Sequence, residues 1–178
     1  GEDYHILLSK RFDRNSDGRR IHFASALTLL GLTDGDNAST GFGYTDITDF
    51  IIQHGSNVEQ NLEELFRRVA FYIIVGNSDD HFRNHGFLLT RKGWELSPAY
   101  DINPTLSDNQ SLLINRTTSE SDINILLASA GDYMLSPEKA KGIITEVIAA
   151  MKSWRTEARR LGLPQRDIDM FAPRFDKW

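Results

Sequence analysis

The chain has 178 residues with 40% hydrophobic and 25% charged side chains, which are the proportions of a globular protein with one good core and exclude disordered, collagen-like and fibrous chains. The absence of cysteine excludes disulfides, thiolate zinc sites and a cysteine nucleophile. The net charge of −5 argues against nucleic-acid binding by bulk electrostatics, and the length fits one domain or one lobe of a larger protein.

Neither a membrane span nor a targeting signal is recognisable in the sequence. The longest apolar run, Val69 to Val75, is interrupted by Tyr72 and is far shorter than the roughly 18 residues that a membrane helix needs. We therefore expect a soluble protein of the cytoplasm. Gly1 stands shortly before a strand-like stretch, Tyr4 to Leu8, with no initiator Met. We interpret Gly1 as a remnant of expression or cleavage and expect natural sequence upstream of it.

The first part of the chain is predicted to alternate short elements with polar loops. A turn at Asn15 to Gly18 follows the first strand, and His22 to Leu32 has the partial apolar stripe of a short helix. Thr33 to Tyr44 is too long and too polar for a tight turn, and we interpret it as a surface loop. Thr45 is predicted to cap a helix over Asp46 to Gln53.

The next helix, capped by Asn57, is expected to be the centre of the domain. Its second half, Val69 to Val75, is apolar on nearly all sides, as in a helix that is buried on most faces. The helix is predicted to end at Gly76. Gly86 to Leu96 is then predicted to form a β-hairpin, and the two prolines within 97–104 favour an extended, irregular segment.

The last third of the chain is predicted to be mainly helical. Ser121 to Ala130 is a short candidate helix, and one long helix is expected from Ser136, which caps it, to Leu161, with Pro137 in the first position. The sequence contains no internal repeat. We therefore predict one mainly α unit of the α+β kind, which carries a small β-hairpin and a short N-terminal strand.

The side chains that carry chemistry are concentrated between the buried helix and the segment after the hairpin. Asp79 and Asn84 lie in the loop before the hairpin, and Asp101 follows it. An amide and a carboxylate oxygen, from Asn84 and Asp101, are ligands of the kind that Mg²⁺ prefers. Asp79 would then be free to orient or deprotonate a hydroxyl nucleophile. This order matches the catalytic loop and metal-binding Asp of protein kinases and predicts phosphoryl transfer.

These residues resemble the HipA-like serine/threonine kinases of toxin–antitoxin systems. Asn77 to Gly86 is similar to that family's catalytic loop, of the form D-x-H-x-K-N, and Leu96 to Ile102 is similar to its L-x-P-x-Y-D metal segment. Arg11 to Arg14 resembles the R-F-D-R of the segment that joins the two kinase lobes. The resemblance covers essentially the whole chain, although its last third carries no motif and is similar only in helical character.

The resemblance implies domains and a role for each matched position. Residues 1–14 would be the hinge strand between the lobes, and residues 15–178 the helical C-terminal kinase lobe. Asp79 would be the catalytic base, and Asn84 and Asp101 would bind Mg²⁺. The residues that would contact ATP are Lys10, Arg11, Phe12, His81, Phe82, Arg83, Asn84, Tyr100 and Asp101.

The resemblance also implies cofactors and partners. ATP and Mg²⁺ would be the cofactors, and the substrate would be a Ser or Thr of a translation factor such as an aminoacyl-tRNA synthetase. A DNA-binding HipB-like antitoxin would be the partner, and the chain would contact DNA only indirectly, through that antitoxin. The sequence departs from the family at Arg83, which replaces the usual Lys, and it holds no Gly-rich phosphate loop or strand Lys before residue 10. We therefore expect the chain to be a poor kinase without an N-terminal lobe.

Several alternatives remain open. The chain could be a non-catalytic kinase-like binding module, or half of a split kinase, that binds an antitoxin or a separate N-terminal lobe. His81 and His85 have the spacing of two zinc ligands on one helix, with Asp79 or Asp101 as a third, although the Glu of an H-E-x-x-H motif is absent. His81 could instead hold the loop by hydrogen bonds, and Phe12 could belong to the core.

Overall fold

The computed structural model describes residues 8–105 and 107–178. Its elements in chain order are β1 (Phe23–Ser25), α1 (Ala26–Leu29), η1 (Ala38–Thr40), α2 (Tyr44–His54), α3 (Val58–Val75), β2 (Gly86–Thr90), β3 (Gly93–Leu96), α4 (Ile123–Ala128), η2 (Ala130–Tyr133), α5 (Pro137–Met151), α6 (Trp154–Arg160) and α7 (Gln165–Phe175). The mainly helical fold with one small sheet confirms the predicted class.

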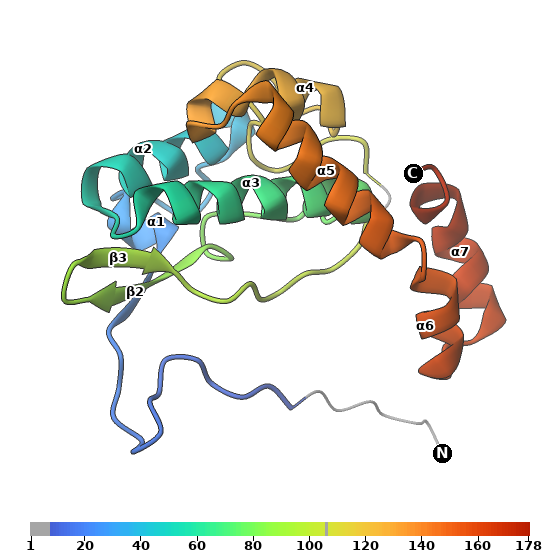
Figure 1. Ribbon diagram of the computed structural model, residues 1–178, viewed down its shortest axis with the longest axis horizontal. Coiled ribbons are helices and arrows are strands. Elements are labelled where there is room, and N and C mark those ends of the chain that lie inside the picture. The colour runs from blue at the N-terminus through green and yellow to red at the C-terminus, as the bar shows by residue number, and fades with distance from the viewer. Residues whose placement is uncertain (1–7, 106) are drawn as a thin grey trace.

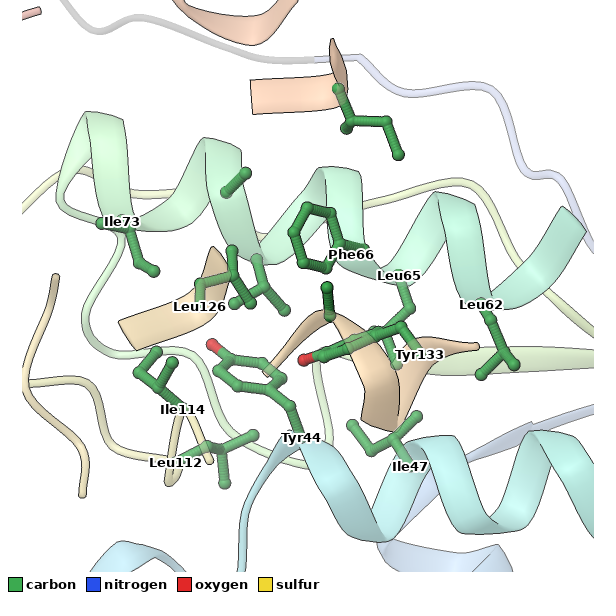
Figure 2. Close-up of a cluster of buried hydrophobic side chains, with 14 of the residues drawn as sticks. Tyr44, Ile47, Leu62, Leu65, Phe66, Ile73, Leu112, Ile114, Leu126 and Tyr133 are labelled. Atoms are coloured by element: carbon green, nitrogen blue, oxygen red, sulfur yellow. The ribbon is translucent and has the colours of Figure 1, made fainter. Parts of the chain in front are cut away.

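Helix α3 is the centre of the domain, as its apolar second half predicted. It packs against α2, α4, α5 and the hairpin strand β3, and the hairpin lies on the opposite side of α3 from α4 (Figure 1). Its inward residues meet buried side chains from α2, α4, η2 and the segment before α4, all labelled in Figure 2: Tyr44, Ile47, Leu126, Tyr133, Leu112 and Ile114. Each large apolar side chain buried in this way contributes about 1.5–3 kcal/mol to folding. Within the described residues, no helix combines the length and apolarity required to cross a bilayer.

The three strands form one antiparallel sheet in the order β1-β2-β3. The predicted hairpin is confirmed, with Leu88 opposite Glu95 in its two strands. The predicted helix over 22–32 is wrong in its first part, because Phe23 pairs with Leu88 and extends the sheet. Helix α1 is only four residues long and is capped by the Ser25 side chain. Tertiary pairing has here overridden a local apolar stripe.

The described part of the N-terminal segment and one helix cap differ from the prediction. Most of the predicted strand at 4–8 and half of the predicted hinge strand at 1–14 lie outside the described residues. The described remainder is irregular, apart from an isolated bridge between Arg14 and Arg20. Helix α2 begins at Tyr44, two residues earlier than a Thr45 cap requires, because Gly43 is its N-cap and donates its N–H to the Asp46 carboxylate at 2.7 Å.

The C-terminal helices also differ from the prediction. The single helix expected from 136 to 161 is divided into α5 and α6, which turn at Lys152 and Ser153. Helix α7 follows and was not predicted, since a glycine and a proline such as Gly162 and Pro164 usually end a helical region. Pro164 in fact precedes the first turn of α7 as its N-cap, a place that tolerates proline because the first N–H groups of a helix have no partner within it.

Gly43 is required where α2 begins beside the chain at Leu113. A Cβ at this position would lie 2.3 Å from the Leu113 carbonyl oxygen and 2.8 Å from its Cα. We therefore expect Gly43→Ala to lower the free energy of unfolding by about 1–3 kcal/mol, measured by urea denaturation. Gly142 is the matched control, because it is exposed within α5 and a Cβ there meets nothing within 4 Å. Gly142→Ala should stabilise the protein by about 0.5–1 kcal/mol, and an equal loss in both variants would contradict this explanation.

Candidate functional site

The loop after α3 turns one aspartate towards solvent and its neighbour into the core. Gly76 ends the helix in the left-handed conformation with φ 73°, and the N–H of Asn77 donates to the Tyr72 carbonyl at 2.9 Å. Beyond it, Asp79 is exposed while Asp80 is fully buried. Because successive side chains in an extended segment point in opposite directions, fixing Asp80 inside the protein also fixes Asp79 outside.

Asp79 faces a cavity of about 360 Å³. Its lining residues come from α1, the loop after α1, the loop after α3 and Ser111, and they are Leu27, Asp34, Gly35, Asp36, Asn37, Asp79, His81, Phe82, Arg83 and Ser111. Four of the predicted site residues therefore lie together. The segment 33–44, interpreted from sequence as a surface loop, forms one wall, and its Asp34 makes an ion pair with Arg83. Phe82 is almost fully buried and packs edge-on against Phe42.

A buried network of three polar side chains holds Asp80. One carboxylate oxygen of Asp80, Oδ2, accepts the Tyr44 hydroxyl at 2.8 Å and lies 2.6 Å from Nε2 of His85. All three side chains are fully buried. Burial, and after it the Asp80 carboxylate, raise the pKa of Tyr44 well above its usual value, so the phenol stays protonated and donates. The network joins α2, the loop after α3 and the residue before β2.

The segment that carries Asp101 is hydrogen-bonded to the residues just before Asp79. Asn103 donates its backbone N–H to Oδ1 of Asn77 at 2.8 Å. The N–H of Thr105 donates to the Gly76 carbonyl at 2.6 Å, and the Thr105 hydroxyl also bonds the Ser78 hydroxyl. Two parts of the chain that lie on either side of the hairpin are thereby brought together.

Asp101 and Asn84 offer only oxygen ligands of the hard kind. Asp101 is exposed, has φ 56°, and accepts one hydrogen bond at Oδ1 from the Asn103 amide at 2.9 Å. A non-glycine residue in this left-handed region is uncommon and is found at functional sites more often than elsewhere. Asn84 is buried to 5% exposure, and no hydrogen bond among the described residues joins Asp79, Asn84 and Asp101 to one another. The donor set itself suits Mg²⁺.

Phe12, one of the residues predicted to contact ATP, lies beside Tyr100. The rings of Phe12 and Tyr100 are stacked with centroids 5.8 Å apart, and Phe23 of β1 lies against both. A cavity of about 260 Å³ opens there, lined by Ser9, Lys10, Arg11, Phe12, Asp13 and Phe23. Tyr100 in turn donates its hydroxyl to the carbonyl of Arg83 at 2.6 Å. The aromatic group is thus connected to the loop that carries Asp79.

Two side chains at this aromatic group, Tyr100 and Asp13, have shifted pKa values. Burial, and then the Asp80 carboxylate, raise the pKa of Tyr100 to about 12, so its hydroxyl remains a donor well into alkaline solution. The guanidinium of Arg11, which bonds Asp13 at 2.7 Å, lowers the pKa of that partly buried carboxyl to about 2, and Arg14 assists. Asp13 therefore stays ionised, and Arg11 is held beside Phe12.

The zinc alternative does not fit this geometry. Residues 77–85 are not helical, so His81 and His85 do not share a helix face, and His85 is engaged with Asp80. Among residues 8–105 and 107–178, no cluster of three or more His, Asp or Glu side chains is placed to hold a metal ion. His81 lies instead in the wall of the cavity near Asp79.

Sequence reasoning missed the buried network and one wall of the cavity. Tyr44 and Asp80 are 36 residues apart, and no motif links them. The sequence did contain one indication of the network. Asp80 stands between a helix and a strand that are both apolar, where a buried carboxylate without a hydrogen-bond donor would be costly. A search for its donors would have pointed to His85, but not to Tyr44.

Comparison with known proteins identifies relatives over most of the chain. A family model described as HipA-like C-terminal domain matches residues 1–155. A Haemophilus influenzae protein named "Putative kinase" is 30% identical over 111 residues, covering 57% of this chain and 32% of that protein. A Sinorhizobium fredii protein named "Putative kinase Y4dM" is 26% identical over 182 aligned residues, covering 94% of this chain and 43% of that protein.

A solved structure has the same fold. It is HipA of Shewanella oneidensis in a toxin–antitoxin complex with HipB and its operator DNA, with a TM-score of 0.72 and 18% identity, covering 94% of this chain and 45% of that one. The chain spans from about a third to less than half of the length of these three relatives.

Proposed function

Since this chain belongs to the family of HipA-like C-terminal domains, we propose that it is the catalytic lobe of a serine/threonine protein kinase that uses ATP and Mg²⁺. One observation carries the proposal above all. Asp79 faces a cavity, while the segment with Asp101 is hydrogen-bonded to Gly76 and Asn77, directly before it. In this proposal Asp79 is the base and Asp101 is the metal-binding carboxylate. The hydrogen bonds between their two segments hold them in a fixed relation to each other, as phosphoryl transfer requires.

Each side chain has a role in this proposal. Asp79 accepts the proton of the substrate hydroxyl, because it is the exposed carboxylate of the cavity. Asn84 and Asp101 hold Mg²⁺, which neutralises phosphate charge when it is bound. His81 and Arg83 contact the phosphates from the cavity wall.

The aromatic group serves the nucleotide base. Phe12 and Tyr100 offer stacked rings, and Lys10 and Arg11 line the same cavity. Arg83 differs from a Lys in having a planar fork with five donors, so it can bind a phosphate through two parallel hydrogen bonds. To do so it must leave Asp34, an exchange of one exposed ion pair that costs little.

The proposed partner and substrate rest on the likeness to the family. The Shewanella HipA is in complex with HipB and DNA, and we propose a HipB-like, DNA-binding antitoxin as the partner here, with any DNA contact indirect. The phosphorylated protein is proposed to be a translation factor such as an aminoacyl-tRNA synthetase, in the cytoplasm. A separate N-terminal lobe supplies the Gly-rich loop and strand Lys that complete an ATP site.

The direct test is transfer of labelled γ-phosphate from ATP to a protein Ser or Thr by the complete gene product. Asp101→Ala should weaken Mg²⁺-dependent ATP binding at least about tenfold, since even the outer partners of metal ligands are worth 10- to 100-fold. Titration calorimetry with Mg²⁺·ATP measures it. Asp169→Ala, which removes an exposed carboxylate of α7, is the matched control and should bind normally. Unchanged binding in the Asp101 variant would remove the metal site from the proposal.

A further inference from the structure

Arg174 is placed where the last helix of the chain meets the end of the central helix. It lies on α7, beyond residues 1–155 that the family model matches. Its Nη2 donates to the carbonyl of Ile73, in the last turn of α3, at 2.7 Å, and its side chain is only 13% exposed. A cation there also interacts favourably with the negative end of the helix dipole.

The guanidinium packs directly on Gly76. A Cβ at Gly76 would lie 3.2 Å from Nε of Arg174 on one side and 2.6 Å from the Thr105 carbonyl oxygen on the other. Nη1 of the same guanidinium reaches the Ser107 carbonyl at 3.4 Å and lies 3.7 Å from the Asp108 carboxylate. One side chain therefore contacts both the end of α3 and the segment that follows Asp101.

These are the two segments that the candidate site depends on. The Gly76 carbonyl accepts the Thr105 N–H at 2.6 Å, and Asn77 accepts the Asn103 N–H at 2.8 Å. Asp79 follows this junction in the sequence, and Asp101 precedes it. A change in how the segments meet would therefore change the separation of the two carboxylates.

Helix α7, which carries Arg174, is joined to α6 by its last residues. Phe175 packs edge-on against the Trp154 ring of α6 with centroids 5.0 Å apart. The Asp176 carboxylate accepts the indole N–H of Trp154 at 3.0 Å and Nε of Arg155 at 3.1 Å. Figure 1 shows α6 and α7 as a pair at the end of the molecule where α3 finishes.

We propose that Arg174 is a positioning residue that sets how the Asp101 segment sits on the end of α3. This inference rests on the proposed kinase function and deepens it, because it makes the α6–α7 pair part of what holds the metal-binding carboxylate in place. The planar fork of arginine bridges carbonyls from two segments, which the single ammonium of a lysine does not reproduce.

Hydrogen exchange in the complete protein tests the placement without any need for activity. In Arg174→Gln, the amides of Asn103 and Thr105 should exchange about 10- to 100-fold faster, as expected on loss of a charge-assisted hydrogen bond near them. Amides in the middle of α5 should not change. Arg174→Lys should show a smaller change in the same direction. Arg166→Gln removes an exposed arginine of α7 that pairs with the adjacent Asp167, and it should match the wild type.

The Mg²⁺ dependence of phosphoryl transfer distinguishes a positioning role of Arg174 from a role in stability alone. At a temperature well below unfolding, Arg174→Gln should raise the Mg²⁺ concentration for half-maximal transfer about tenfold, and Arg166→Gln should leave it unchanged. Unchanged exchange at Asn103 and Thr105, or faster exchange in α5 as well, would overturn the proposal. Faster exchange at Asn103 and Thr105 without a change in the Mg²⁺ requirement would mean that Arg174 only caps α3. That result would also overturn the proposal. A wild type that transfers no phosphate would defeat the kinase proposal instead, while the exchange result would still decide the placement.

Discussion

The Asp79→Asn variant of the complete gene product is expected to lose phosphoryl transfer by about 10²- to 10⁴-fold, the usual contribution of a positioned general base. Binding of Mg²⁺·ATP should remain within a factor of about two, because the substitution conserves shape and the proposed metal ligands are Asn84 and Asp101. Asp79 is exposed in the cavity wall, and no hydrogen bond to another described residue depends on its charge. The fold should therefore be unaffected.

Two measurements on the same preparation decide this prediction. Single-turnover transfer from labelled ATP measures the chemical step, and calorimetry with Mg²⁺·ATP measures binding. Asp169→Asn on α7 repeats the chemical change at an exposed carboxylate far along the chain and should retain full activity. Full transfer by the Asp79 variant would exclude Asp79 as the base. If the wild type binds nucleotide or an antitoxin but transfers nothing, the chain is a binding module or one half of a split kinase.

The elements that sequence predicted best are those in which local pattern and tertiary context agree. Helix α3 has an apolar second half and ends at Gly76 because the left-handed conformation there suits glycine. The hairpin follows from two short apolar runs around Gly93, whose φ of 135° is open only to glycine without strain. In both cases the residues that decide the structure are neighbours in sequence.

The elements that sequence missed depend on contacts between distant residues. Phe23 is a strand residue because it pairs with Leu88, and no residue near Phe23 in the sequence indicates this pairing. Helix α7 follows a glycine and a proline that usually end a helical region, and its role becomes visible only where Arg174 meets Ile73. Spacing within one loop predicted which residues carry chemistry, but not what holds them.

The buried network around Asp80 yields the largest expected effect on stability. Asp80→Ala should lower the free energy of unfolding by about 3–5 kcal/mol, because it leaves the Tyr44 hydroxyl and Nε2 of His85 buried without an acceptor. That is a large part of the roughly 5–15 kcal/mol by which a domain is usually stable. Urea denaturation followed by circular dichroism measures it, with Asp79→Ala, next in sequence but exposed, as the control that should change stability by less than about 0.5 kcal/mol.

A pair of tyrosines separates the hydrogen bond from the packing around it. Tyr44 and Tyr133 are both fully buried, but the Tyr44 hydroxyl bonds Asp80 at 2.8 Å, whereas that of Tyr133 has no hydrogen-bond partner among the described residues. Tyr44→Phe should therefore cost about 1–3 kcal/mol, and Tyr133→Phe should be neutral or stabilising, since it removes a buried hydroxyl that makes no bond. Equal effects of the two substitutions would mean that the core tolerates either hydroxyl for reasons of shape alone. The orientation of Asp79 would then need an explanation other than the anchoring of Asp80.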